Sequence, residues 1–148
     1  VSKNEILLSL LEFFRSEMEG RLMASSNIQH DHAGDDLRSI FNKQLQTFTQ
    51  KPAIVSVIFA ESIFHFDKTL SNKVNEIMDL MHGYVLNNIT LGQKNNQYSK
   101  LIGPSVLTTL LLGGIRMTVL KWKLSGHKSN LIKNGNAVLE GVLKMIEK

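Results

Sequence analysis

The last 45 residues carry more apolar surface than one helix–helix contact can cover. Residues 104–124 and 131–146 both show apolar side chains at helical spacing, on two adjacent sides of each helix. The two stripes of the first helix are Val106, Leu110, Gly113, Met117 and Leu120, and, beside them, Leu107, Leu111, Ile115, Thr118 and Trp122. A helix on the surface of a lone globule needs one apolar stripe, so a helix with two needs two partners.

The second helix repeats the pattern after a short polar turn at residues 125–128. Its two stripes are Leu131, Gly135, Val138 and Val142, beside Ile132, Leu139, Leu143 and Ile146. We therefore expect this hairpin to pack on its own domain with one side and on a second copy with the other, as a four-helix bundle. The predicted interface residues are Leu107, Leu111, Gly114, Thr118, Trp122, Val138, Val142 and Met145. The alternative is that both stripes are buried in one monomeric core.

The rest of the chain also reads as helical, which predicts an all-α domain of about six helices over residues 1–148. Residues 2–5 (Ser-Lys-Asn-Glu) form a capping box that starts a helix over residues 2–24. Further helices are expected over 36–49, from Pro52, and from Asp67 to about residue 92, before a polar linker at 93–103. Pro104 then opens the hairpin, and Ser129 is expected to cap its second helix.

Composition excludes several classes of protein. The chain has no cysteine, so disulfides, thiolate metal sites and thiol nucleophiles are ruled out. No apolar run approaches the roughly 20 residues that span a bilayer, and no signal-peptide layout is present, so we expect a cytoplasmic protein without a membrane partner. The net charge of +4 arises in residues 113–148, where the lysines are scattered and lack interleaved aromatics. This pattern favours a solvated face over a nucleic-acid site.

Motifs for catalysis and for cofactors are absent. The sequence contains no Gly-rich phosphate loop, no H-E-x-x-H and no nucleophile elbow, so an enzyme is not expected. His30, Asp31 and His32 are adjacent in a polar loop, but histidines two apart do not share a helical face. We predict neither a metal nor a cofactor.

A set of soft and aromatic side chains lies on the apolar faces of the first four helices. Such side chains suit an adaptable pocket for an apolar ligand, although they equally form plain core. The candidate ligand-binding residues are Phe14, Met18, Phe41, Phe59, Ile63, Met78, Met81 and Tyr84.

The whole chain resembles the C-terminal regulatory domain of TetR-family (tetracycline-repressor-like) transcriptional regulators. Residues 2–8 (SKNEILL) look like the segment that follows the family's helix-turn-helix, and residues 104–126 look like its eighth helix. The resemblance implies a homodimer that binds a small apolar or amphipathic effector. It also implies that operator DNA is bound only through an N-terminal domain that this chain lacks.

By that resemblance, an effector in the pocket alters the spacing of the DNA-binding heads in the parent dimer. DNA half-sites lie about one helical turn, ~34 Å, apart, so a small pivot of the first helix disturbs operator binding. A structural helical dimerisation module with a filled core and no ligand remains the alternative.

Overall fold

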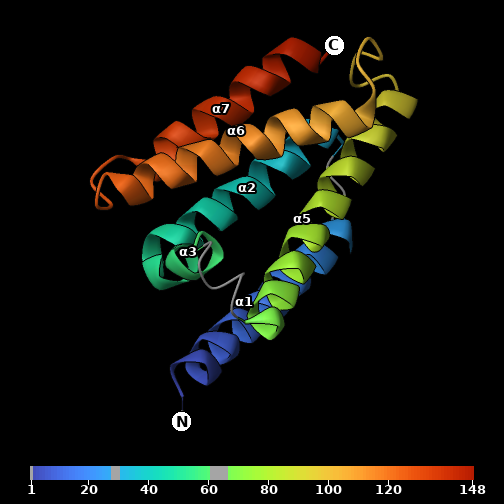
Figure 1. Cartoon of the computed structure of the whole chain (residues 1–148). Coiled ribbons are helices and arrows are strands. Elements are labelled where there is room, and N and C mark those ends of the chain that lie inside the picture. The colour runs from blue at the N-terminus through green and yellow to red at the C-terminus, as the bar shows by residue number, and fades with distance from the viewer. Residues whose placement is uncertain (1, 28–30, 61–66) are drawn as a thin grey trace.

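Six α-helices make up the part of the chain that the computed structural model describes, residues 2–27, 31–60 and 67–148. They are α1 (Lys3–Asn27), α2 (Ala33–Gln50), α3 (Pro52–Ile58), α5 (Lys68–Lys94), α6 (Pro104–Leu124) and α7 (Leu131–Ile146), shown in Figure 1. Within these ranges the only strand-like pairing is an isolated bridge between Tyr98 and Glu147. The predicted all-α fold is confirmed.

Local capping chemistry sets where the helices begin. The Ser2 hydroxyl accepts from the Glu5 amide at 3.1 Å and the Glu5 carboxylate accepts from the Ser2 amide at 3.3 Å, which completes the predicted capping box. Asp67 caps α5 by accepting from the Leu70 amide at 3.0 Å. Pro52 and Pro104 each lie in the first turn of a helix, where the missing N–H costs nothing.

The cap of the last helix differs from the prediction. Asn130, not Ser129, is the N-cap of α7, and its side-chain oxygen accepts from the Lys133 amide at 3.1 Å. The preceding turn passes through the left-handed region at Gly126 and His127, with φ of 69° and 65°. Because this turn uses one more residue than expected, the cap moves one position along the chain.

The predicted polar linker is an ordered connection. Its first two residues complete α5, and Tyr98 is then buried, with its hydroxyl donating to Asn88 Oδ1 at 2.9 Å. Gln97 donates to the Asp31 carbonyl and accepts from the Ala33 amide, so the linker also holds the start of α2. These contacts join the ends of α2 and α5.

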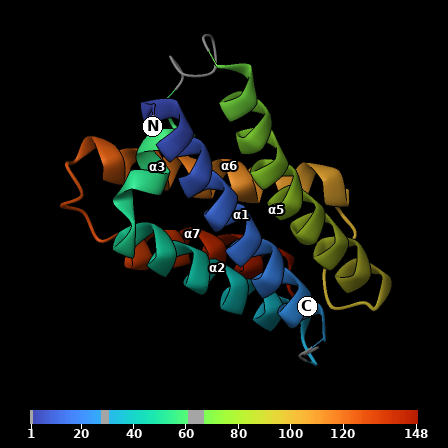
Figure 2. The same cartoon turned by 90° about the horizontal axis from the view of Figure 1, so that it is seen from below.

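The helices form two crossed groups. In Figures 1 and 2, α6 and α7 lie side by side with α2 against α7, while α1 and α5 form a pair that crosses them. The N-terminal end of α1 lies far from the α6–α7 hairpin in Figure 1. The apolar core between the groups includes the fully or almost fully buried Leu11, Phe14, Leu37, Phe41, Leu45, Val85, Ile89, Leu111 and Leu139.

The hairpin has one buried and one exposed apolar side, and three of the predicted interface residues, all on α6, lie on the buried side. Leu107, Leu111 and Trp122 are 0–3% exposed, since they pack into the core of their own chain and cannot face a second copy. Gly114 serves the same internal packing, because a Cβ there would lie 2.9 Å from Val138 Cγ1. Thr118, Val138 and Val142 are half-buried, and Met145 alone of the predicted interface residues is strongly exposed.

Candidate ligand-binding site

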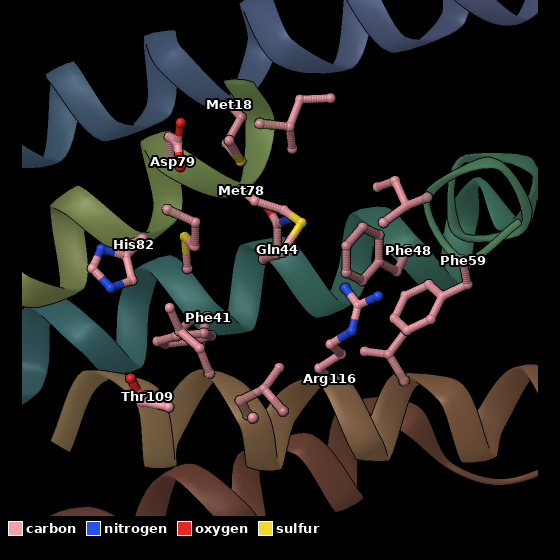
Figure 3. A pocket seen from close by; sticks show the side chains of 17 residues that line it. Met18, Phe41, Gln44, Phe48, Phe59, Met78, Asp79, His82, Thr109 and Arg116 are labelled. Atoms are coloured by element: carbon pink, nitrogen blue, oxygen red, sulfur yellow. The ribbon is translucent and has the colours of Figure 1, made fainter. Parts of the chain in front are cut away.

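A cavity of about 370 Å³ lies between α2, α5 and α6 and is closed at one end by α3. This volume falls within the range of about 300–1,000 Å³ that is usual for small-molecule sites. Figure 3 shows its side chains converging from α2, α5 and α6, with Met18 contributed by α1. The lining consists of Met18, Phe41, Gln44, Phe48, Ile58, Phe59, Ile77, Met78, Asp79, Met81, His82, Thr109, Leu112, Gly113, Ile115, Arg116 and Val119.

The inner part of the cavity is apolar and its mouth is partly polar. Phe41, Ile77, Met81 and Val119 are among the buried lining residues. Arg116, Asp79, His82 and Thr109 are exposed and stand around the opening. Such an arrangement buries an apolar group of a ligand and leaves polar contacts at one rim.

Two polar side chains are fixed by neighbours within the site. Gln44 is buried, and its Oε1 accepts from Arg21 Nη2 at 3.3 Å. Burial lowers the pKa of the Arg21 guanidinium relative to its ordinary value. The guanidinium of Arg116 lies 4.5 Å from the centre of the Phe59 ring, within the range of a cation–π contact. Both groups are therefore placed before any ligand arrives.

Five of the eight predicted ligand-binding residues line this cavity. They are Met18, Phe41, Phe59, Met78 and Met81. Phe14 does not line the cavity. Its side chain is fully buried in the core, where the centre of its ring lies 5.8 Å from the centre of the Phe48 ring. Tyr84 lines a different cavity, and Ile63 falls outside the described residues.

The prediction missed the whole contribution of α6. One wall of the cavity consists of Leu112, Ile115, Arg116 and Val119. The sequence pattern of this helix predicts only core residues and dimer contacts. One signal was available, because Arg116 is the only charged residue between positions 104 and 120. A single charged residue in such an apolar helix indicates a side chain that is either exposed to solvent or engaged in a polar contact.

A second cavity, of about 330 Å³, lies near the start of α2 and the C-terminal half of α5. Its polar lining groups largely satisfy one another, as Tyr84 and Ser25 share a hydrogen bond of 2.8 Å and Asn88 Nδ2 donates to the Ala33 carbonyl at 2.9 Å. The first cavity combines an apolar interior with polar groups at its mouth, so we take it as the better candidate site.

The exposed side of the hairpin is a second candidate surface. We call it the α6–α7 face and define it by Val106, Leu110, Gly113, Met117, Leu124, Gly141 and Met145. Val106, Leu110 and Met117 are each 55% exposed, and Leu124 and Met145 are 76% and 75% exposed. A Cβ at Gly113 or Gly141 would meet no atom within 4 Å, so this face is open and shallow at both glycines.

Within the described ranges, no three His, Asp or Glu residues are grouped so that they could bind a metal ion. In the same part of the chain no helix combines the length and hydropathy needed to cross a bilayer.

No protein-family model and no curated protein matches the sequence. Solved structures do match it. The chain aligns with the MbdR regulator from Azoarcus sp. CIB at a TM-score of 0.79 and 18% identity, over 96% of this chain and 76% of that one. For a TetR-family transcriptional regulator from Agrobacterium tumefaciens the TM-score is 0.77 and the identity 12%, over 99% and 76%.

The chain is also similar to the transcriptional regulator FadR from Bacillus subtilis, solved in complex with stearoyl-CoA, with a TM-score of 0.71 and 19% identity over 99% and 77% of the two chains. At identities this low, the structural similarity establishes the fold alone. This chain has the all-α fold of TetR-family regulators, as its sequence resemblance predicted, and the matched proteins are transcriptional regulators rather than enzymes.

Proposed function

We propose that residues 1–148 are the ligand-sensing and dimerisation domain of a cytoplasmic TetR-like transcriptional regulator, in which a separate helix-turn-helix domain binds operator DNA. The observation that carries this proposal is the apolar cavity between α2, α5 and α6, in a fold shared with known regulators. The effector is a small apolar or amphipathic molecule. The FadR structure with stearoyl-CoA gives one amphipathic precedent on this fold.

The route from cavity to DNA runs through α5 and α1. Five cavity residues belong to α5, among them Ile77, Met78 and Met81, so a ligand that enters displaces this helix. Lys73 of α5 forms an ion pair with Glu12 of α1, and Asn4 donates to the Asp67 carboxylate at 2.8 Å. A shift of α5 is therefore carried to the N-terminal end of α1, where the operator-binding domain joins.

Two such domains in a dimer must present their DNA-binding heads at one spacing. A pivot of α1 changes that spacing, so the effector and the operator weaken each other's binding. Such reciprocal coupling between sites is typically about 1–3 kcal/mol. An effector that binds this domain without changing the operator affinity of the full-length regulator would contradict the mechanism.

We propose that the homodimer forms through the α6–α7 face. This face gathers five large apolar side chains that are more than half exposed, and such patches are uncommon on monomeric proteins unless they serve an interaction. Gly113 and Gly141 leave room for another helix to approach closely. Two hairpins that meet there form the four-helix bundle expected from the sequence.

Native mass spectrometry of the purified chain tests both parts. We expect a dimer, with an added mass of a few hundred daltons that denaturant removes if the effector is retained. A clean dimer that no amphiphile stabilises against heat would favour the ligand-free dimerisation module. A monomer at micromolar concentration would contradict the proposed assembly.

A further inference from the structure

The cavity combines an apolar interior with one fixed cation at its rim. Arg116 extends from α6 toward the space between Phe48 and Phe59 (Figure 3), and its guanidinium lies 4.5 Å from the Phe59 ring centre. Among the described residues, no carboxylate lies within salt-bridge distance of Arg116, whereas Arg15 and Arg38 are each paired with several. The Phe59 ring therefore positions the guanidinium of Arg116, and no carboxylate of the described residues neutralises it.

The other charged groups of the lining lie elsewhere on the rim. Asp79 and His82 belong to α5 and stand at the end of the cavity away from Arg116 in Figure 3. No salt bridge joins Asp79 to Arg116, and a histidine carries no negative charge, so neither group neutralises the arginine. A ligand seated on Phe41, Met81 and Ile115 and reaching Phe59 brings its end group to the guanidinium, not to Asp79.

We infer that the ligand of this cavity is an amphiphile with one anionic end group, a carboxylate or a phosphate monoester, that pairs with Arg116. Guanidinium binds both groups through two parallel hydrogen bonds, and an anion there supplies a partner that no carboxylate of the described residues provides. The flexible thioethers of Met18, Met78 and Met81 suit an alkyl or aryl tail. This inference rests on the ligand-binding function proposed above.

Four probes that each contain ten carbon atoms in an unbranched chain separate the contributions of tail and charge. We would measure the binding of decanoate, decyl phosphate, decanol and decylammonium to the whole chain by calorimetry, below their micelle concentrations. Decanoate or decyl phosphate should bind about tenfold or more tightly than decanol, as expected for a charge-assisted hydrogen bond at a partly exposed site. The tighter of the two anions identifies the end group.

Substitution of the cation gives the matching test. Arg116→Gln should weaken binding of the preferred anion about tenfold and leave decanol binding unchanged. Because Arg116 is exposed, we expect this variant to fold, and circular dichroism would verify that. Lys121→Gln removes an exposed cation of the same helix outside the cavity and should change neither affinity.

The outcomes distinguish the two proposals. Equal binding of decanol and the anions, tighter binding of decylammonium, or an Arg116→Gln variant with unchanged anion affinity would overturn the anionic ligand but leave the cavity as a binding site. Failure of all four probes to bind would remove the site itself, and with it the proposed ligand sensing.

Discussion

Glycine at position 92 is required by the ring of Tyr98. A Cβ built on Gly92 would lie 2.3 Å from Cδ2 of that ring. Because the Tyr98 side chain is almost fully buried, a small shift of the ring cannot relieve this clash. We expect Gly92→Ala to lower the free energy of unfolding by about 2 kcal/mol, in the range typical of overpacked cores. Urea denaturation measures the change.

Gly83 provides the matched control on the same helix. A Cβ there would meet no atom within 4 Å, so Gly83→Ala should leave stability unchanged or raise it by up to about 1 kcal/mol through helix propensity. If the two substitutions had the same effect, helix propensity and not the contact with Tyr98 would account for Gly92.

We expect the hydroxyl of Tyr98 to make the free energy of unfolding decrease at alkaline pH. Burial raises the pKa of this phenol above its ordinary value of 10.0. A raised pKa in the folded state means that the stabilisation is complete below about pH 10 and is lost as the pH rises, because the unfolded chain releases the proton first. Urea unfolding of the wild type should therefore show a loss of stability above that pH.

Tyr98→Phe isolates this contribution. Near neutral pH the variant should be less stable by about 1–2 kcal/mol, since the Asn88 side-chain oxygen loses its donor. The difference from the wild type should shrink between about pH 9 and about pH 11, because phenylalanine has no proton to release. A difference that stayed constant over this range would show that Tyr98 does not titrate with unfolding.

At the scale of helices, the N-terminus of α5 is where α1 and α5 are joined. One carboxylate both caps α5 and accepts from Asn4 of α1. We expect Asp67→Ala to lower the unfolding free energy by about 1 kcal/mol, mostly through the lost cap. Asn4→Ala keeps the cap and removes only the exposed contact with α1, so thermal denaturation should show a smaller effect. Equal effects would assign the contribution to the contact between helices.

Helix α6 has three sides with different surroundings. One side packs on α7, a second lines the cavity with Ile115 and Arg116, and a third exposes Leu110 and Met117. A helix that packs on the core with one side only needs a narrower apolar stripe. The near-continuous apolar surface of residues 104–120 is therefore explained by the cavity as well as by packing.

For the whole molecule, dimerisation predicts a concentration-dependent melting temperature. A folded dimer is stabilised by mass action, so the melting temperature should rise as the protein concentration is raised a hundredfold from about 2 µM. Met117→Asp places a charge in the α6–α7 face and should abolish this dependence while the monomer stays folded. Lys43→Asp, an exposed substitution on α2, should retain it. A wild-type melting temperature independent of concentration would contradict the dimer.

Three helix starts, at Ser2, Asp67 and Pro104, were determined by the sequence alone. These residues act on backbone groups within a few residues of themselves, so their effect does not depend on the rest of the fold. Apolar periodicity likewise predicted the all-α fold and five residues of the cavity. These features are local, and local chemistry can be read from a single chain.

Only the tertiary structure decided which side of each helix meets which neighbour. Helical spacing gives the angles between side chains around one axis, but not the rotation of that axis relative to other helices. The packing of α3, α5 and α7 around α6 turned Leu107 and Trp122 inward, left Leu110 outside and brought Arg116 to the cavity. The same packing separated Tyr84 from Met81, although both lie on α5, because a helix that crosses several partners presents different residues to each.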